Sequence, residues 1–190
     1  MTIRTSSARR ARTRAHARRD ILESAARVFA RRGYAAATLA ELARSAGYAA
    51  PSLYRYFGSK EEIFESLLAL VSAEIQEVFD APVDRSVPLP GRLAALFVAL
   101  HRVAEERGET MDLLAAQVDA VERQARLERL LESWLRRHVG RRELRVPLPL
   151  AARAMAGILF ALRHGTGRTG NDPGQMARAA ADLVLHGVSA

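Results

Sequence analysis

The sequence predicts an all-α protein in which an N-terminal three-helix bundle with a helix-turn-helix is followed by a domain of roughly six helices. Ala and Leu far outnumber Val and Ile, a balance that favours packed helices over sheets. Apolar residues recur at spacings of three and four through most of the 190 residues, the period of an amphipathic helix. Two stretches, residues 81–91 and 140–149, break the pattern with proline or glycine. We therefore expect essentially no strand.

Positive charge is concentrated at the N-terminal end. Of the net charge of +8, residues 1–19 contribute +7 from seven arginines and no acid, residues 20–60 contribute +3, and the rest contribute −2. This asymmetry is typical of a nucleic-acid-binding end joined to a body with another role. Residues 1–17 hold almost no large apolar side chain, so we expect a flexible basic arm. The alternatives are a solvated tail without a partner and an organelle transit peptide.

Composition and spacing exclude several kinds of site. The chain has no cysteine, which excludes disulfides, thiolate metal sites and cysteine nucleophiles, and suits a reducing cytoplasm. No apolar run approaches the roughly 18–20 residues needed to cross a bilayer, so we expect no membrane partner. His101, His138 and His164 lack metal-ligand spacing, and no nucleophile motif, phosphate loop or carboxylate pair is present. We expect no metal, no cofactor and no catalytic residue.

The N-terminal part shows the signals of two helices. An apolar stripe over residues 18–29 predicts the first helix, which Gly33 is placed to end in the left-handed conformation. Thr38 and Glu41 then form a capping box, in which each side chain satisfies a backbone N–H of the other residue. This box opens a short second helix that ends at Gly47.

A third and a fourth helix follow directly. Pro51 suits the first turn of the third helix, which we expect to run to Gly58. Ser59 and Glu62 form a second capping box that opens the fourth helix, with an apolar stripe over residues 63–78. Two short helices joined by a glycine-containing turn form the helix-turn-helix arrangement, whose second helix enters the major groove of DNA. Further helical stripes cover residues 93–103, 111–118, 121–135, 150–164 and 172–186.

The third helix separates anchoring from exposed side chains. Leu53 and Phe57 lie four residues apart and would anchor it in the core, which leaves the polar side chains between them for DNA. Lys60 stands in the first turn of the fourth helix, where backbone N–H groups and a cation together favour a phosphate.

The segment from Thr38 to Glu62, TLAELARSAGYAAPSLYRYFGSKEE, resembles the signature of the TetR family of bacterial regulators. The resemblance extends from about Arg18 to Leu70. It implies a three-helix DNA-binding head, a ligand-binding body of about six helices, and a dimer built from the final two helices. The expected domains are therefore the arm at 1–17, the helix-turn-helix domain at 18–64, and a ligand-binding and dimerisation domain at 65–190.

The resemblance also implies which residues touch DNA. Thr38 and Lys60 would contact phosphates, and the basic run before the first helix adds candidates. The full expected set is Arg18, Arg19, Thr38, Ser52, Tyr54, Arg55, Tyr56 and Lys60. The chain departs from many relatives at Ala49 and Ala50, where a polar residue is common. Alanine offers only a methyl contact, for instance to thymine.

Together these features predict a sequence-specific transcriptional regulator, cytoplasmic and associated with the nucleoid. We expect a repressor that binds double-stranded DNA at a palindromic operator and is released by an unidentified small-molecule effector. The alternatives are an activator of the same fold, a helical enzyme, or an architectural DNA-binding protein. Residues that could line the effector pocket, each equally typical of plain helical core, are Phe97, His101, Met111, Trp134, Phe160 and His164.

The last two helices are expected to form a homodimer. Each carries an apolar stripe edged with small residues, which lets two copies close a four-helix bundle about a two-fold axis. The expected interface residues are Ala152, Met155, Ala156, Leu159, Met176, Ala180, Leu183 and Val184. A two-fold axis would let two identical heads meet two inverted half-sites.

Overall fold

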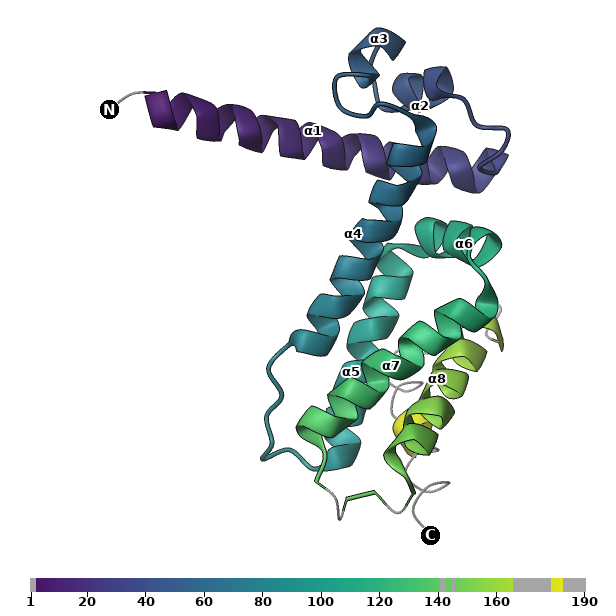
Figure 1. Cartoon of the computed structure of the whole chain (residues 1–190). Coiled ribbons are helices and arrows are strands. Elements are labelled where there is room, and N and C mark those ends of the chain that lie inside the picture. Colours follow the sequence, from purple (N-terminus) through teal and green to yellow (C-terminus); the bar gives the residue numbers. More distant parts are fainter. Residues whose placement is uncertain (1–2, 141–142, 145, 166–178, 183–190) are drawn as a thin grey trace. The chain divides into compact units, whose positions relative to one another are not determined.

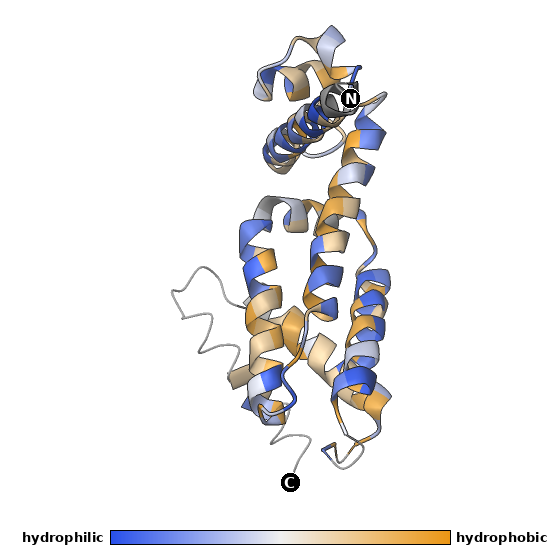
Figure 2. Cartoon of the chain, turned by 90° about the vertical axis from the view of Figure 1, so that its left-hand side faces the viewer, coloured by the Kyte–Doolittle hydropathy of each residue, from blue (hydrophilic) through white to orange (hydrophobic). Residues whose placement is uncertain are grey.

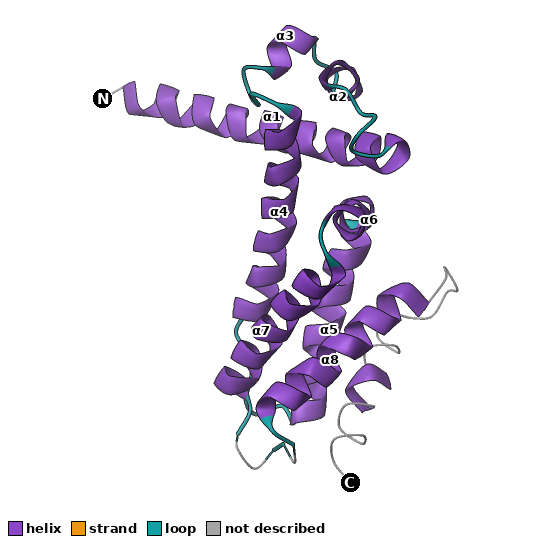
Figure 3. Cartoon of the chain, turned by 45° about the vertical axis from the view of Figure 1, so that its right-hand side comes forward, coloured by secondary structure: helices purple, strands orange, loops and turns teal. Residues whose placement is uncertain are grey.

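The computed structural model describes residues 3–140, 143–144, 146–165 and 179–182, which are helical or loop with no strand (Figures 1 and 3). The all-α prediction is confirmed. The helices are α1 (Ile3–Arg32), α2 (Leu39–Ser45), α3 (Ala50–Leu53), α4 (Lys60–Asp80), α5 (Leu89–Glu106), α6 (Gly108–Gln117), α7 (Ala120–His138) and α8 (Leu148–Gly165). Residues 179–182 are also helical. Within these described ranges, no helix is long and apolar enough to span a membrane.

The chain divides into two compact units. The head unit comprises Met1–Ser72 and Arg107–Gln117, and the body unit comprises Ala73–Glu106 and Val118–Ala190. The division therefore falls inside α4, and α6 belongs to the head unit, whereas the sequence placed one boundary after residue 64 and gave α6 to the body. Periodicity shows which face of a helix is apolar, but it does not show which neighbour covers that face.

The head unit has its own apolar core. α1 packs against both α2 and α6, and α2 packs against α3. Because Leu42 and Ala43 of α2 and Leu113 of α6 are buried against the same helix, α1 is the common support of the unit. The largest buried side chains of this core are Ile21, Phe29, Leu42, Leu53, Phe57, Ile63 and Leu67.

The expected flexible arm is helical instead, as the first half of α1. Residues 1–19 contain neither proline nor glycine, and Ala and Arg are among the strongest helix formers. A helix already fixed by its buried half, residues 17–29, extends at low cost because elongation avoids the expensive nucleation step. Every side chain described between residues 8 and 16 is exposed, and this half is coloured mostly hydrophilic in Figure 2. The sequence correctly indicated that this N-terminal half is not buried, but an exposed segment can still be helical.

The expected helix ends are largely confirmed. Gly33 and Gly47 both adopt φ of +77°, the left-handed conformation that ends α1 and α2. At Thr38 the capping box is complete, since the hydroxyl accepts from the Glu41 N–H and the Glu41 carboxylate accepts from the Thr38 N–H. α3 is shorter than predicted: it ends at Leu53, and residues 54–56 form a turn, although Pro51 does occupy its first turn.

The body unit buries a second core among the end of α4 and helices α5, α7 and α8. Phe79 of α4, Leu93 and Phe97 of α5, and Trp134 of α7 are almost completely buried there. α7 and α8 pack along each other in Figure 1 and make the most extensive contact between helices in this unit. Asp119 caps α7, because its carboxylate accepts from the Val121 N–H at 2.6 Å.

Candidate nucleic-acid interface

The short helix α3 and the turn after it present a polar surface on an apolar anchor. Leu53 and Phe57 are each 1% exposed, as the sequence predicted, because the head core covers both. Between them, Tyr54 is 58% exposed and Arg55 is also exposed. The turn stays closed through hydrogen bonds from the Tyr56 and Phe57 N–H groups to the Leu53 carbonyl, at 2.8 and 3.0 Å. The phenol of Tyr54 and the guanidinium of Arg55 are therefore held at the surface by the buried side chains of Leu53 and Phe57.

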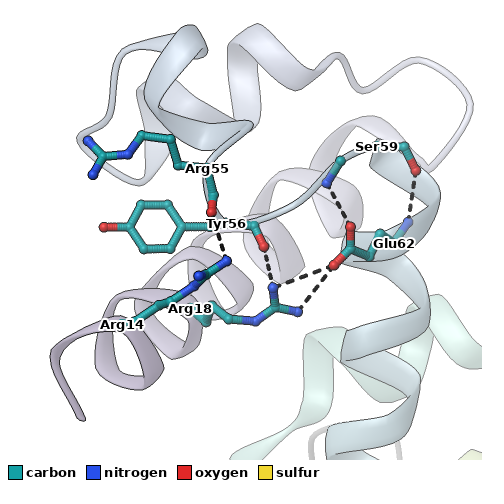
Figure 4. Close-up of polar contacts among 7 residues, drawn as sticks. Arg14, Arg18, Arg55, Tyr56, Ser59 and Glu62 are labelled. Carbon is teal, nitrogen blue, oxygen red and sulfur yellow. Dashed lines mark hydrogen bonds and ion pairs between the residues drawn. The ribbon is translucent and has the colours of Figure 1, made fainter. Parts of the chain in front are cut away.

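Two arginines of α1 hold this turn in place (Figure 4). Arg14 donates from Nη2 to the Arg55 carbonyl at 3.0 Å, and Arg18 donates to the Tyr56 carbonyl. The Arg18 guanidinium also lies 4.0 Å from the centre of the Phe57 ring, a cation–π contact. Arg18 was expected to contact DNA, whereas in this structure its donors point into the head unit. A basic run shows where charge is, but not which acceptor a particular guanidinium finds.

Glu62 is the acidic member of the same network. Its carboxylate accepts from the Gly58 N–H at 2.7 Å and lies 3.4 Å from the Arg18 guanidinium, while its own N–H donates to the Ser59 hydroxyl at 3.1 Å. The second capping box is thus present in altered form, with the carboxylate reaching Gly58 instead of Ser59. The hydrogen bond from Gly58, followed by Arg18, lowers the pKa of Glu62. This residue fixes the start of α4 to the turn after α3.

Lys60 makes intramolecular contacts where a phosphate contact was expected. Its Nζ donates to the carbonyls of Tyr34, Ala35 and Ala37 at 2.9, 3.3 and 3.1 Å, and lies 4.6 Å from the centre of the Tyr34 ring. The ammonium thus satisfies the carbonyls of the loop between α1 and α2. Its position in the first turn of α4 was visible in the sequence, but this loop, some 25 residues earlier, was not identifiable as its partner.

The other expected DNA contacts differ in exposure. Thr38 is exposed, and its hydroxyl serves the capping box. Arg19 is exposed on α1, in contrast to its neighbour Arg18. Ser52 and Tyr56 are half-buried, and the Tyr56 ring meets that of Tyr48 edge-on at 5.6 Å. The outermost expected contacts are therefore Arg19, Thr38, Tyr54 and Arg55.

Arg14, Tyr48 and Glu62 also support this surface, a role that the sequence did not indicate, although it did predict Glu62 as a capping residue. Arg14 and the carbonyl that it reaches are 41 residues apart, and Arg18 and Glu62 are 44 apart. No local pattern links residues at such separations. The only available signal was the unusual density of arginine on the helix that precedes the motif.

Of the residues expected to line an effector pocket, Phe97 and Trp134 belong to one buried cluster of the body unit, and the others are distributed over α5, α6 and α8. Phe97 and Trp134 are each 1% exposed within the body core, and Met111 lies on α6 in the head unit. His101 is half-buried at 3.9 Å from Glu105. Phe160 is exposed on α8, and the side chain of His164 lies outside the described residues. Helical stripes identify buried faces, but several buried faces need not share one cavity.

Three expected dimer residues on α8, namely Ala152, Met155 and Ala156, are at most 1% exposed in the single chain, and so is Ala180. A side chain already buried in its own subunit offers no further area to a partner, so these four form core. Leu159 is half-buried against the same core. Met176, Leu183 and Val184 lie outside the described residues. The sequence showed the apolar stripe of α8 correctly but assigned it to the wrong surface.

The opposite face of α8 is the exposed one. Leu150 is 53% exposed and Phe160 is 38% exposed, with Arg153 and Gly157 on the same face between them. Spacings of three and four place these residues along one line of the helix. A Cβ added at Gly157 would meet nothing within 4 Å.

Most of the residues that build this interface lie in a segment that matches a sequence model of known proteins. Residues 21–67 match the sequence model described as bacterial regulatory proteins, tetR family. The chain is 35% identical over 88 residues to the HTH-type transcriptional repressor KstR2 of Mycobacterium tuberculosis, covering 44% of each chain. It is 36% identical over 63 residues to the HTH-type transcriptional repressor AcnR of Corynebacterium glutamicum, covering 33% of this chain and 34% of that one. The chain thus spans less than half the length of these curated relatives.

Solved structures match over a longer range. The TetR family transcriptional regulator PfmR from Thermus thermophilus is 29% identical, with a TM-score of 0.65 over 87% of this chain and 97% of that one. A bacterial regulatory protein in the tetR family from Rhodococcus has a TM-score of 0.71 at 17% identity, over 90% and 96% of the two chains. At 17% identity, the similarity to the Rhodococcus protein shows only that the two chains share a fold. Both confirm the helical architecture of head and body.

Proposed function

Because this chain belongs to the TetR family of bacterial regulatory proteins, we propose that it is a DNA-binding transcriptional repressor. It binds a palindromic operator as a homodimer and leaves it when a small-molecule effector binds. The observation that carries this proposal is the pair Tyr54 and Arg55, held outward in the turn after α3 because the flanking residues Leu53 and Phe57 are anchored in the head core. Such a regulator acts in the cytoplasm on nucleoid DNA.

The proposed DNA surface combines this pair with the exposed charge of α1. Arg55 is suited to base edges or phosphates and Tyr54 to the backbone and groove, with Ser52 and Tyr56 behind them. Arg19 and the helical basic segment before it neutralise phosphates, which gives affinity without reading sequence. Thr38 contacts a phosphate from its position at the start of α2. Lys60 and Arg18 act chiefly by holding the loop before α2 and the turn after α3 in position.

Repression is favoured over activation because two relatives that match the head, KstR2 and AcnR, are named repressors. An activator of the same fold would use the same DNA contacts, so binding alone does not separate the two modes. Transcription in vitro from a promoter that overlaps the recovered operator does separate them. Repression predicts that added protein lowers transcript yield, and activation predicts that it raises the yield.

The homodimer is proposed to use the exposed face of α8, with Leu150, Gly157 and Phe160 against a second copy. Small residues allow close approach of helix backbones, and an isologous contact ends at two chains. Effector release requires a ligand that prefers the conformation with lower operator affinity, which shifts the population away from DNA. The same coupling requires operator DNA to weaken effector binding by an equal factor.

The function is tested by selecting bound fragments from random DNA with the full-length protein. We expect an inverted repeat, and we expect affinity for it to fall steeply with salt because phosphate contacts release counterions. Recovery of no sequence above background would contradict sequence-specific binding. A recovered repeat without two-fold symmetry would contradict the homodimer but leave DNA binding intact.

The placement of the reading surface is tested by Tyr54→Ala. Tyr54 is 58% exposed, so its removal leaves the fold intact, and we expect operator affinity measured by fluorescence anisotropy to fall by about tenfold, the loss of one good contact. The matched control is Val121→Ala, which removes another exposed apolar side chain, 75% exposed, from α7. Equal affinities of the two variants would show that the turn after α3 does not meet DNA.

A further inference from the structure

A second electropositive site lies in the body unit, apart from the proposed DNA surface. A cavity of about 370 Å³ is lined by basic side chains from three segments: Arg85 before α5, Arg92 on α5, and Arg136, Arg137 and His138 at the end of α7. Among the described residues that line it, Glu143 is the one carboxylate. The volume falls within the range of roughly 300–1,000 Å³ typical of small-ligand pockets.

The charges around this cavity are not balanced within the described part of the chain. Arg137 pairs with Asp80 at 3.0 Å, and Arg136 pairs with Glu132 at 2.6 Å. Arg85 pairs with no carboxylate among the described residues; it donates instead to the Arg137 carbonyl at 2.6 Å. Across the described ranges, this guanidinium therefore has no counter-charge.

Arg92 supplies a buried donor in the same wall. It is only 7% exposed, and its two terminal nitrogens donate to the His138 carbonyl and the Glu143 carboxylate. Its Nε has no hydrogen-bond partner among the described residues. Buried N–H groups of native proteins are almost always paired, and an unpaired one is costly.

The pKa of His138 reflects the positive charge around the cavity. Burial lowers the pKa of its imidazole, and the neighbouring cations Arg137, Arg85 and Arg92 lower it further. Its ring also packs against Trp134, with ring centres 5.2 Å apart, so the imidazole is fixed at the wall. The cations outweigh Glu143 at this point, which is the electrostatic condition for holding an anion.

Basic residues at the end of a helix have a simpler explanation, since they compensate the negative end of the helix dipole. That explanation covers Arg136, Arg137 and His138, which all belong to the last turn of α7. It does not cover Arg85 and Arg92, which reach the same cavity from another part of the chain.

From this convergence, we propose that the arginine cavity binds an oxyanion, the phosphate or carboxylate group of a small metabolite. A guanidinium group binds either oxyanion through paired N–H donors. What the two ligands share is a group of acceptor oxygens, planar in a carboxylate and tetrahedral in a phosphate. The inference does not depend on operator binding, and the ligand need not be the effector that releases DNA. Its failure would therefore leave the proposed function standing.

The test uses the full-length protein and follows the His138 imidazole by NMR, with His138→Gln to assign its signal. Sulfate serves as a pH-independent probe for phosphate and succinate as the probe for carboxylates, each against sodium chloride of equal ionic strength. We expect one of the two oxyanions to raise the His138 pKa saturably, by about one unit, because a bound negative charge favours the imidazolium. Chloride should leave it almost unchanged.

Arg85→Gln is the variant that decides the matter, because Arg85 is exposed in a loop and its loss spares the core. We expect it to weaken oxyanion binding at least tenfold. Arg102→Gln is the matched control, since it removes the same charge from an exposed position on α5 that does not line the cavity. Equal binding by both variants, or an equal response to chloride, would show that the cluster only compensates the end of α7 and would overturn the proposal.

Discussion

Arg18 and Lys60 show how the head unit uses cations internally. Each is polar and lies beside the proposed DNA surface, yet each donates to backbone carbonyls of the loops between helices. Their residue types and their places in the basic N-terminal end could be read from the sequence. Their acceptors could not, because these lie on loops brought close only by the packing of α1 under α2, α3 and α4.

The first prediction at this scale separates positioning from contact. Arg18→Gln should lower operator affinity by about tenfold without changing the slope of affinity against salt, because Arg18 holds the turn at Tyr56 and touches no phosphate. Arg19→Gln, the exposed neighbour, should instead reduce the slope by about one, as expected for a lost phosphate contact. Fluorescence anisotropy over a salt series measures both. A reduced slope for Arg18→Gln would return it to the set of direct contacts.

The second prediction concerns pH. The Gly58 N–H and then Arg18 lower the pKa of Glu62 from its ordinary value of 4.5. A carboxylate whose pKa is lower when folded stabilises the fold above its unfolded pKa, and that contribution is lost as pH falls through the folded value. Glu62→Gln should therefore lower the free energy of unfolding at pH 7 and lose less stability than wild type on acidification below about pH 5.

Urea unfolding followed by circular dichroism at several pH values gives the comparison. The control is Glu65→Gln, which removes a carboxylate from the exposed side of the same helix. If both variants followed the same pH profile, the contacts of Glu62 with Gly58 and Arg18 would contribute nothing specific to stability.

At the scale of elements, the sequence predicted helix ends better than helix lengths. Caps are local, so Thr38 with Glu41 and the glycines at 33 and 47 could be identified from spacing alone. Lengths depend on context: α1 extends outward from its buried half, and α3 stops at Leu53, where the chain must turn toward α4. The partner of α6 was also beyond reach, because an apolar stripe fits any apolar neighbour.

The helical state of the N-terminal segment leads to the third prediction. Deletion of residues 1–12 removes four arginines but keeps Arg14 and its contact with the Arg55 carbonyl. We expect operator and random DNA to lose affinity by a similar factor, and the salt slope to flatten, because these side chains meet phosphates and not bases.

A second variant distinguishes charge from helix. Replacement of the same arginines by alanine keeps the helix, since alanine is the strongest helix former, but removes the charge. It should bind DNA like the deletion while retaining the helical signal in circular dichroism that the deletion loses. Unchanged salt slopes in both variants would make this half of α1 a solvated extension.

At the scale of the whole molecule, sequence and structure differ in which face of α8 is available for the homodimer. Both agree that α8 is amphipathic with small residues, but the structure turns its most apolar stripe inward, to Ala152 and Met155. A charge at one of those positions would disturb the subunit's own core, so it would not report on the dimer. The exposed line through Leu150, Gly157 and Phe160 offers a cleaner site.

The last prediction follows from Gly157. Because a Cβ there would meet nothing within 4 Å, Gly157→Glu leaves the single chain intact, whereas at a two-fold interface it buries two carboxylates without partners, at a cost of several kcal/mol. We expect light scattering to show a dimer for wild type and a monomer for the variant, with operator affinity falling in parallel. Gly108→Glu is the control, since Gly108 is also helical with open space at Cβ and lies on α6. A wild-type monomer, or a Gly157→Glu dimer that still binds operator fully, would exclude this face as the interface. A Gly108→Glu variant that stays dimeric and binds operator like wild type would show that the loss depends on the exposed face of α8.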